Sequence, residues 1–215
     1  MKLPVPLLSP TDPFPDPSKA SRDGLVAMTR NLLPDQLLEA YRKGIFPWTE
    51  KPVTWWSPDP RGVLPLDQLH VPRRLEKTIR SGSFTFTMNQ CFEEVVRGCA
   101  QPAKGREESW IGPCFLKAYG DLHRMGYAVS YEAWKDGKLA GGLYGVKIGR
   151  FFAGESMFHQ VRDGSSAVLV FAAKTLQAEG CILFDLQMVT PHTKRFGAIE
   201  VKRVEYLKML RGAVG

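Results

Sequence analysis

The sequence predicts an α+β protein with a mixed sheet in its C-terminal part. The length of 215 residues is enough for one large domain or two modest ones, each with a real core. The first half alternates proline-rich segments with amphipathic helical patterns. Residues 127–188 instead follow the order strand, strand, strand, helix, strand, which favours a helical crossover into a parallel or mixed pairing.

The N-terminal part divides into two segments by composition. Prolines interrupt residues 1–20, which predicts an extended arm, lying on the surface or mobile, and not a secretory signal. Residues 21–65 contain a predicted helix opened by Pro34 and closed by Gly44. The string TWWSPDPRGVLP ends this segment, and its prolines predict a rigid loop.

Residues 66–215 form the C-terminal part. It begins with the helix RRLEKTIR, the strand SFTFTM and the two helices CFEEVVRGCA and CFLKAYGDLHRMG. A turn at Asp136-Gly137 and another at Gly149-Arg150 then predict a three-strand meander over 127–158. The next helix, SSAVLVFAAKTLQAEG, has Ser165 or Ser166 as its cap and is followed by the buried strand CILFDLQMV.

Charge and composition narrow the classes of function. The net charge is +7, which favours a polyanionic partner about as strongly as a merely basic enzyme. No apolar run approaches the roughly 20 residues of a membrane helix, so no membrane partner is expected. The four cysteines form no C-x-x-C pair and the four histidines no H-x-x-x-H pair, so we expect packed, reduced thiols, no metal and no cofactor.

Three acidic or amide side chains stand out within apolar strands. Asp185 and Gln187 are two apart, so an extended strand places them on one face, about 6.5–7 Å apart. Burying a carboxylate is costly, which makes Asp185 a functional candidate at even odds with a side chain that tips out at the strand end. Glu155 shares its predicted face with Phe151 and Met157, which disfavours a simple solvent position.

Tryptophans and basic residues suggest a second kind of site. Trp48, Trp55, Trp56 and Trp110 fall in predicted loops or at helix edges. Such residues usually cover a core, and in a basic protein they are also candidates for stacking on bases. The helix at 73–80 carries a basic stripe that is either a solvated face or a phosphate contact, formed by Arg73, Arg74, Lys77 and Arg80.

The order of elements resembles the acyltransferase fold of the GCN5-related N-acetyltransferase superfamily. Those enzymes hold the acetyl-CoA pyrophosphate with a loop of the form [QR]-x-x-G-x-[GA]. The equivalent loop here, HQVRDGSSA, places Arg162 and Gly164 only two apart. The sequence therefore argues against acetyl-CoA as the donor, although the helix start still favours a phosphate.

Six strings resemble one particular family over residues 25–205. They are AYRKGIFPW (40–48), WWSPDPRGVLP (55–65), SWI (109–111), GGLYGV (141–146), FFAGESMF (151–158) and FDLQMVTPHTKRFGAIEV (184–201). In this order they resemble leucyl/phenylalanyl-tRNA–protein transferase. The resemblance implies a small N-terminal α/β domain, residues 21–65, followed by an acetyltransferase-like catalytic domain with a mixed sheet, residues 66–215. It also implies a cytoplasmic enzyme that takes Leu or Phe, less readily Met, from aminoacyl-tRNA. The acceptors would be proteins beginning with Arg or Lys, marked in this way for N-end rule degradation.

The resemblance also implies roles for single residues. Asp185 and Gln187 match the catalytic pair, and Glu155 matches a glutamate near the reacting centre. Trp48 and Trp110 would hold the terminal adenosine, with Tyr41 and Tyr119 helping to build that site. The pocket for the donor side chain would be lined by Leu143, Phe152, Met157 and Val168. The helix with Arg73, Arg74, Lys77 and Arg80 would meet the acceptor stem.

Two departures and three alternatives accompany this assignment. The loop VRDGSSA lacks the family's Asn-Ala-Ser-Lys string, and Leu143 stands where Met is frequent. The alternatives are an acetyl-CoA-dependent N-acetyltransferase, a non-catalytic RNA-binding module, and an aminoacyl-tRNA-dependent peptide-bond former of cell-wall synthesis. The RNA-binding alternative leaves Glu155, Asp185 and Gln187 without a reason.

Overall fold

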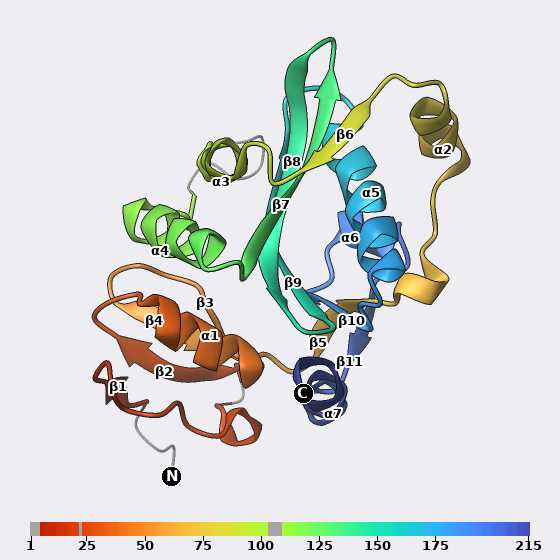
Figure 1. Ribbon diagram of the computed structural model, residues 1–215. Coiled ribbons are helices and arrows are strands. Elements are labelled where there is room, and N and C mark those ends of the chain that lie inside the picture. The colour runs from red at the N-terminus through yellow and green to blue at the C-terminus, as the bar shows by residue number, and fades with distance from the viewer. Residues whose placement is uncertain (1–4, 22, 103–108) are drawn as a thin grey trace.

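The computed structural model describes residues 5–21, 23–102 and 109–215. These residues form two sheets, a four-stranded sheet near the N-terminus and a seven-stranded sheet that contains the other strands (Figure 1). Helices cover both faces of the larger sheet, so the α+β class and the mixed sheet predicted from the sequence are confirmed.

The small sheet includes part of the predicted arm. Its strands lie in the order β1 (Leu7–Leu8), β2 (Leu25–Thr29), β4 (Val53–Trp56), β3 (Phe46–Pro47). Strand β1 pairs in parallel with the end of β2, and Phe14 is buried with its ring 4.7 Å from that of Trp55. Phe14 thus joins the core of the small sheet and Leu8 packs against it, whereas Leu7 and most other described residues of the arm stay exposed or half-buried.

The segment TWWSPDPRGVLP, predicted to be a rigid loop, consists largely of strands in the structure. It contains most of β4 and all of β5 (Arg61–Leu64); Pro58 and Pro60 lie in the connection between these strands, and Pro65 follows β5. The indole Nε1 of fully buried Trp55 donates to Thr29 Oγ1 at 3.0 Å. The proline signal correctly located the turn, but the flanking residues pair with strands of two different sheets that sequence spacing does not reveal.

The large sheet is built around the predicted meander. Its strand order is β11 (Ile199–Val201), β5 (Arg61–Leu64), β10 (Leu183–Gln187), β9 (Phe151–His159), β8 (Lys138–Ile148), β7 (Ala128–Lys135), β6 (Thr85–Met88). Strands β9 and β10 run parallel, with Leu183 opposite Phe151, and the other pairs are antiparallel. The predicted strand–strand–strand–helix–strand order and its parallel crossover pair are confirmed.

The helices separate onto the two faces of this sheet. They are α1 (Pro34–Arg42), α2 (Arg73–Arg80), α3 (Phe92–Ala100), α4 (Pro113–Arg124), α5 (Gly164–Ala178), α6 (Pro191–Lys194) and α7 (Arg203–Val214), with 3₁₀ turns at Pro17–Lys19 and Leu66–Gln68. Figure 1 shows α3 and α4 on one face and α5 on the other. Alternate residues of β9 and β10 pack into two different cores, one on each face of the sheet. Phe151 and Leu183 pack with α1, α4 and α7, whereas Phe152 and Phe184 pack with α5.

Helix α5 begins at Gly164, before both of the serines that were predicted as alternative caps. The preceding residue, Asp163, has φ 66°, and its side chain makes no capping hydrogen bond. Ser165 and Ser166 lie inside the first turn and are buried, so the prediction that one of them caps the helix is wrong. The start is pressed against β8: a Cβ on Gly164 would lie 2.3 Å from the carbonyl oxygen of Ala140, which only glycine allows.

The predicted division into 1–20, 21–65 and 66–215 stays a prediction. Strand β1 belongs to the small sheet although it lies in the first segment, and β5 belongs to the large sheet although it lies in the second. Three of the four cysteines are at least partly buried, but Cys114 is exposed at the start of α4.

Candidate active site

The site forms where two parallel strands separate. Strands β9 and β10 pair only over Phe151–Ala153 and Leu183–Asp185. Beyond that point each strand has a register shift against its other neighbour: Glu155 has no partner on β8, and Leu186 has none on β5. Bulges of this kind re-aim side chains and are frequent beside active sites. Here they break the predicted alternation and turn Glu155 and Gln187 toward each other.

The backbone of Gln187 is held in an unusual conformation. Its φ is 58°, in the left-handed region that residues other than glycine seldom adopt. Its amide N donates to Asp185 Oδ1 at 2.9 Å, and its side-chain Nε2 donates to Glu155 Oε1 at 3.2 Å. The neighbouring strand comes very close: a Cβ on Gly62 would lie 2.5 Å from the carbonyl carbon of Met188. Glycine at 62 thus permits the bulge that positions Gln187.

Asp185 lies beneath the site in a buried ionic network. Arg61 donates from Nε to Oδ1 at 2.8 Å and from Nη2 to Oδ2 at 2.6 Å, and the Tyr206 hydroxyl donates to Oδ2 at 2.8 Å. Arg61 also donates to the carbonyl oxygen of Gly44 at 3.1 Å, which ties the network to the end of α1. Both charged side chains are essentially inaccessible to solvent. Because burial raises the pKa of Tyr206 well above its usual value, its hydroxyl stays a donor.

Glu155 is a titratable group that Gln187 connects to this network. Burial raises the pKa of Glu155 to about 7, against the opposing effect of hydrogen bonds from tyrosine hydroxyls. The Tyr119 hydroxyl donates to Oε2 at 2.9 Å and is itself 2.5 Å from the Tyr41 hydroxyl. A side chain that changes its charge near neutral pH is suited to proton transfer.

Two pockets meet at Glu155 and Gln187. They share five residues: Glu155, Leu186, Gln187, Met188 and Thr190. The larger pocket, about 360 Å³, is also lined by Leu143, Gly154, Ser156, Met157, His159, Ser165, His192 and Thr193. The smaller pocket, about 150 Å³, is also lined by Phe46, Pro47, Trp48 and Trp110. The carboxyl–amide pair of Glu155 and Gln187 thus borders both an aromatic pocket and a pocket with a mixed apolar and polar lining.

The structure brings most of the predicted site residues together. Trp48 and Trp110 line the smaller pocket, Leu143 and Met157 line the larger one, and Tyr41 and Tyr119 reach Glu155 through their hydroxyls. Asp185 lines neither pocket and contacts the backbone, not the side-chain amide, of Gln187.

Phe152 and Val168 are not among the residues that line either pocket. Both are fully buried, and the Phe152 ring is 4.9 Å from that of Phe184 in the α5-side core. Phe152 precedes the point where β9 and β10 separate, so its neighbours still close over it. The prediction that these two side chains line a substrate pocket is therefore wrong for this conformation.

The basic helix lies apart from the pockets. The side chains of Arg73, Arg74, Lys77 and Arg80 are exposed, and none of them lines either pocket. Figure 1 shows α2 beside α5, at the edge of the molecule, with Leu75 as its buried anchor. Arg80 also pairs with Glu76 at 3.0 Å on the helix surface. Contact of this helix with RNA stays a prediction.

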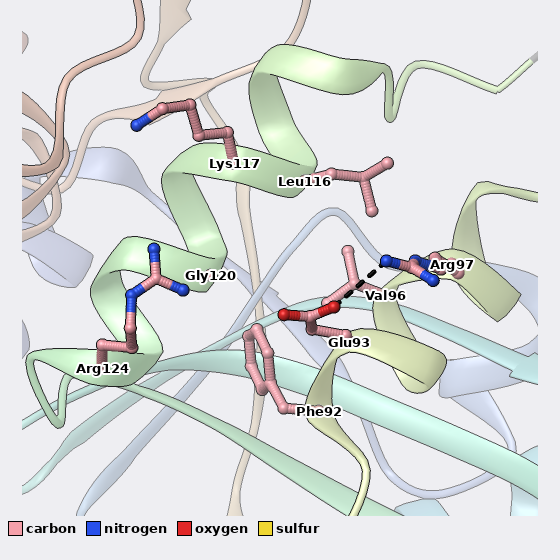
Figure 2. Close-up of a pocket in the computed structure, with 8 residues that line it drawn as sticks. All are labelled: Phe92, Glu93, Val96, Arg97, Leu116, Lys117, Gly120 and Arg124. Atoms are coloured by element: carbon pink, nitrogen blue, oxygen red, sulfur yellow. Dashed lines mark hydrogen bonds and ion pairs between the residues drawn. The ribbon is translucent and has the colours of Figure 1, made fainter.

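A further pocket, of about 220 Å³, separates α3 from α4 (Figure 2). Its cations already have acidic partners: Arg97 pairs with Glu93, while Lys117 and Arg124 both pair with Asp121. None of the predicted site residues lines it. This surface therefore has little charge left for a ligand and lies outside the candidate site.

Arg61, Tyr206 and His192 were not singled out from the sequence. Arg61 stands in the string WWSPDPR, but only the fold shows that it forms an ion pair with a residue 124 positions away.

Among the described residues no group of His, Cys, Asp and Glu is arranged to hold a metal ion. None of the helices in the described segments has the length and apolar character needed to span a bilayer.

The meander, crossover helix and splayed parallel pair define an acetyltransferase-type fold. The model of the leucyl/phenylalanyl-tRNA protein transferase family matches residues 63–211, and that of its N-terminal domain matches residues 30–59. The chain belongs to this family of aminoacyltransferases.

Relatives of the same name match almost the whole chain. A leucyl/phenylalanyl-tRNA–protein transferase of Nitratidesulfovibrio vulgaris (strain DP4) is 47% identical over 203 residues, which cover 93% of this chain and 87% of the relative. One of Anaeromyxobacter dehalogenans (strain 2CP-C) is 47% identical over 209 residues, covering 95% and 90%. Among solved structures, L-PGS from Bacillus licheniformis is similar with a TM-score of 0.48 and 9% identity, over 88% of this chain and 73% of that one.

Proposed function

We propose that this protein transfers Leu or Phe, and less readily Met, from aminoacyl-tRNA to the N-terminal α-amine of proteins that begin with Arg or Lys. The products would enter N-end rule degradation, and the reaction would take place in the cytoplasm. The observation that carries the proposal is the hydrogen bond between Gln187 Nε2 and Glu155 Oε1, 3.2 Å long, on the boundary of two pockets. Family membership supports the same reaction.

The donor would occupy both pockets at once. The terminal adenosine stacks between Trp48 and Trp110, because every base offers a face that an indole can cover. The donor side chain enters the larger pocket beside Leu143, Met157 and Leu186. Each methylene in such an apolar pocket changes discrimination by only about 1–3 kcal/mol, so the preference among Leu, Phe and Met is graded.

Glu155 is the group that we assign as proton acceptor. The attacking α-amine has a pKa of about 7.7–8.0 and must lose a proton. A carboxylate whose pKa is about 7 takes this proton as the nitrogen attacks the ester carbonyl carbon. The new C–N bond forms, the C–O bond to the ribose breaks, and the ribose oxygen leaves with the proton from Glu155. The aminoacyl ester is already activated, so no ATP is required.

Gln187 and Asp185 have different parts in this scheme. The Gln187 amide holds the Glu155 carboxyl and offers a neutral contact to the incoming amine, since an amide is a poor base. Asp185 acts as a positioning residue, because Arg61, Tyr206 and the Gln187 amide N engage both of its oxygens and it lines neither pocket. We therefore place the proton transfer on Glu155 and not on Asp185.

Charge also suits the proposed substrates. Among the described residues that line the two pockets, Glu155 is the one acidic side chain, and a cationic acceptor would meet this negative group. The exposed basic side chains of α2 would contact the acceptor stem through its phosphates, without reading its sequence.

A transfer assay tests the proposal. Purified protein is mixed with radiolabelled Leu-tRNA and a test protein that begins with Lys or Arg, and the control is the same protein beginning with Ala. We expect label only on the Lys and Arg versions. Label on none of them, with the donor intact, would contradict the proposal, and binding of labelled acetyl-CoA would then favour the acetyltransferase alternative.

A further inference from the structure

Part of the lining of the larger pocket is polar, and the proposed reaction assigns no role to these residues. This polar wall consists of His159, Ser165, Thr190, His192 and Thr193. The adenosine and the apolar donor side chain would be held elsewhere, by the tryptophans and by Leu143 and Met157. A wall of neutral hydrogen-bonding groups is of little use to an apolar side chain, but it suits the second, polar substrate.

His192 is the member of this wall that lacks a hydrogen bond. Its Nε2 is covered by protein and has no hydrogen-bond partner in the part of the chain that the structure describes. Buried polar atoms are nearly always satisfied, because an unsatisfied one costs free energy in the folded state. Because His192 itself lines the pocket, a small movement of its ring would let a substrate supply the partner that Nε2 lacks.

The start of the helix that carries His192 is fixed, and one neighbouring ring packs on the imidazole. Helix α6 begins with a capping box in which Thr190 Oγ1 accepts from Thr193 N at 3.1 Å and Thr193 Oγ1 accepts from Thr190 N at 3.0 Å. The His192 ring packs on Phe196, with 5.3 Å between ring centroids. Burial, with the nearby positive charge of Arg195, lowers the pKa of His192, so the imidazole is neutral at pH 7 and does not repel a cation.

We propose that His192 is a substrate-contacting residue that binds the N-terminal residue of the acceptor protein. Its neutral imidazole accepts a hydrogen bond from the acceptor's amino or backbone N–H group and holds that residue against the polar wall, facing Glu155 and Gln187. A side-chain adjustment of the size common on binding brings Nε2 to the ligand. This inference rests on the proposed function, because it needs two substrates that meet in this pocket.

Steady-state kinetics with the full chain test the inference. Transfer from radiolabelled Leu-tRNA is measured at varied concentrations of a peptide that begins with Arg, for wild type, His192→Leu, His192→Gln and His70→Leu. His70 lines neither pocket, so its variant controls for the loss of a histidine. We expect His192→Leu to raise the KM for the peptide about tenfold and the KM for Leu-tRNA less than twofold. His192→Gln, which keeps a hydrogen-bonding side chain, should restore most of the peptide affinity.

The outcomes separate the two proposals. A wild-type chain that transfers no leucine to any peptide refutes the proposed function, and this inference falls with it. A normal peptide KM in His192→Leu, or a rise in the Leu-tRNA KM in its place, overturns the inference and leaves the proposed function standing. If His192→Leu does not fold, His192→Phe replaces it, since a flat ring of similar size can still pack on Phe196.

Discussion

Two carboxylates lie close to Gln187, and the protein treats them in opposite ways. Asp185 is fully buried, bonded by Arg61 and Tyr206, and closed off from both pockets. Glu155 faces both pockets, has no bonded cation among the described residues, and has its pKa raised to about 7. The difference is that a bidentate arginine offsets the cost of burial for one carboxylate only. The first group is suited to hold geometry and the second to move a proton.

Asp185→Ala should have the largest effect and should act through stability. Removing one partner of a buried ion pair leaves Arg61 uncompensated and costs about 3–5 kcal/mol. Thermal unfolding followed by circular dichroism should show a lower Tm, with transfer activity lost as well. Asp185→Leu combined with Arg61→Met should regain stability without regaining activity. A single Asp185→Ala variant with unchanged Tm would refute the structural role that we assign to this residue.

Glu155→Gln should instead act mainly on turnover. Losing a general base typically costs 10²–10⁴-fold in rate, so we expect kcat to fall at least about 100-fold. In wild type, activity should decline as the pH falls below about 7, and the variant's residual rate should lack this limb. The pH profile of single-turnover transfer measures both. A variant that keeps the wild-type rate and profile would exclude Glu155 as the proton acceptor.

The same variant should change how stability depends on pH. The pKa of Glu155 in the folded protein, about 7, lies above its ordinary value of 4.5, so folding binds a proton and stability falls as pH rises from 4.5 through 7. Glu155→Gln removes this loss, which we put at about 1–3 kcal/mol at pH 8 and near zero at pH 4. Urea unfolding at the two pH values provides the comparison. Equal differences at both would contradict the raised pKa.

Gln187 lies between the two carboxylates and should separate backbone from side-chain effects. Both Gln187→Gly and Gln187→Ala remove the contact with Glu155, and we expect each to slow transfer about tenfold or more. Only glycine accepts φ 58° without strain, so Gln187→Gly should unfold at a higher temperature than Gln187→Ala by an equivalent of about 1 kcal/mol. The reverse order of Tm values would mean that the bulge relaxes in the variants.

Trp48→Ala should give the smallest change, confined to the donor. Loss of one stacking surface is worth about 1–3 kcal/mol per base, which predicts a higher KM for Leu-tRNA and an unchanged KM for the acceptor peptide. Trp56→Ala is a matched control, because Trp56 packs on Trp48 but lines neither pocket. Equal effects of the two variants on the KM for Leu-tRNA would indicate a packing role for Trp48.

The sequence by itself determined the order of elements and much of the site. Period-two and helical patterns, turn dipeptides and helix-ending glycines located the meander, α5 and β10, because those signals are local. Polar residues inside apolar strands marked Glu155, Asp185 and Gln187, and the family's strings marked Trp48 and Trp110.

Only the tertiary structure decided what each of these residues contacts. Arg61 and Asp185 are 124 positions apart, and no local pattern reports such a pairing. The two register shifts, at Glu155 and beside Gln187, depend on which strands lie alongside, and they overturn the simple alternation that placed Glu155 with Met157. Burial then set the difference between the two carboxylates, because the free energy of a charge depends on its surroundings and not on its position in the chain.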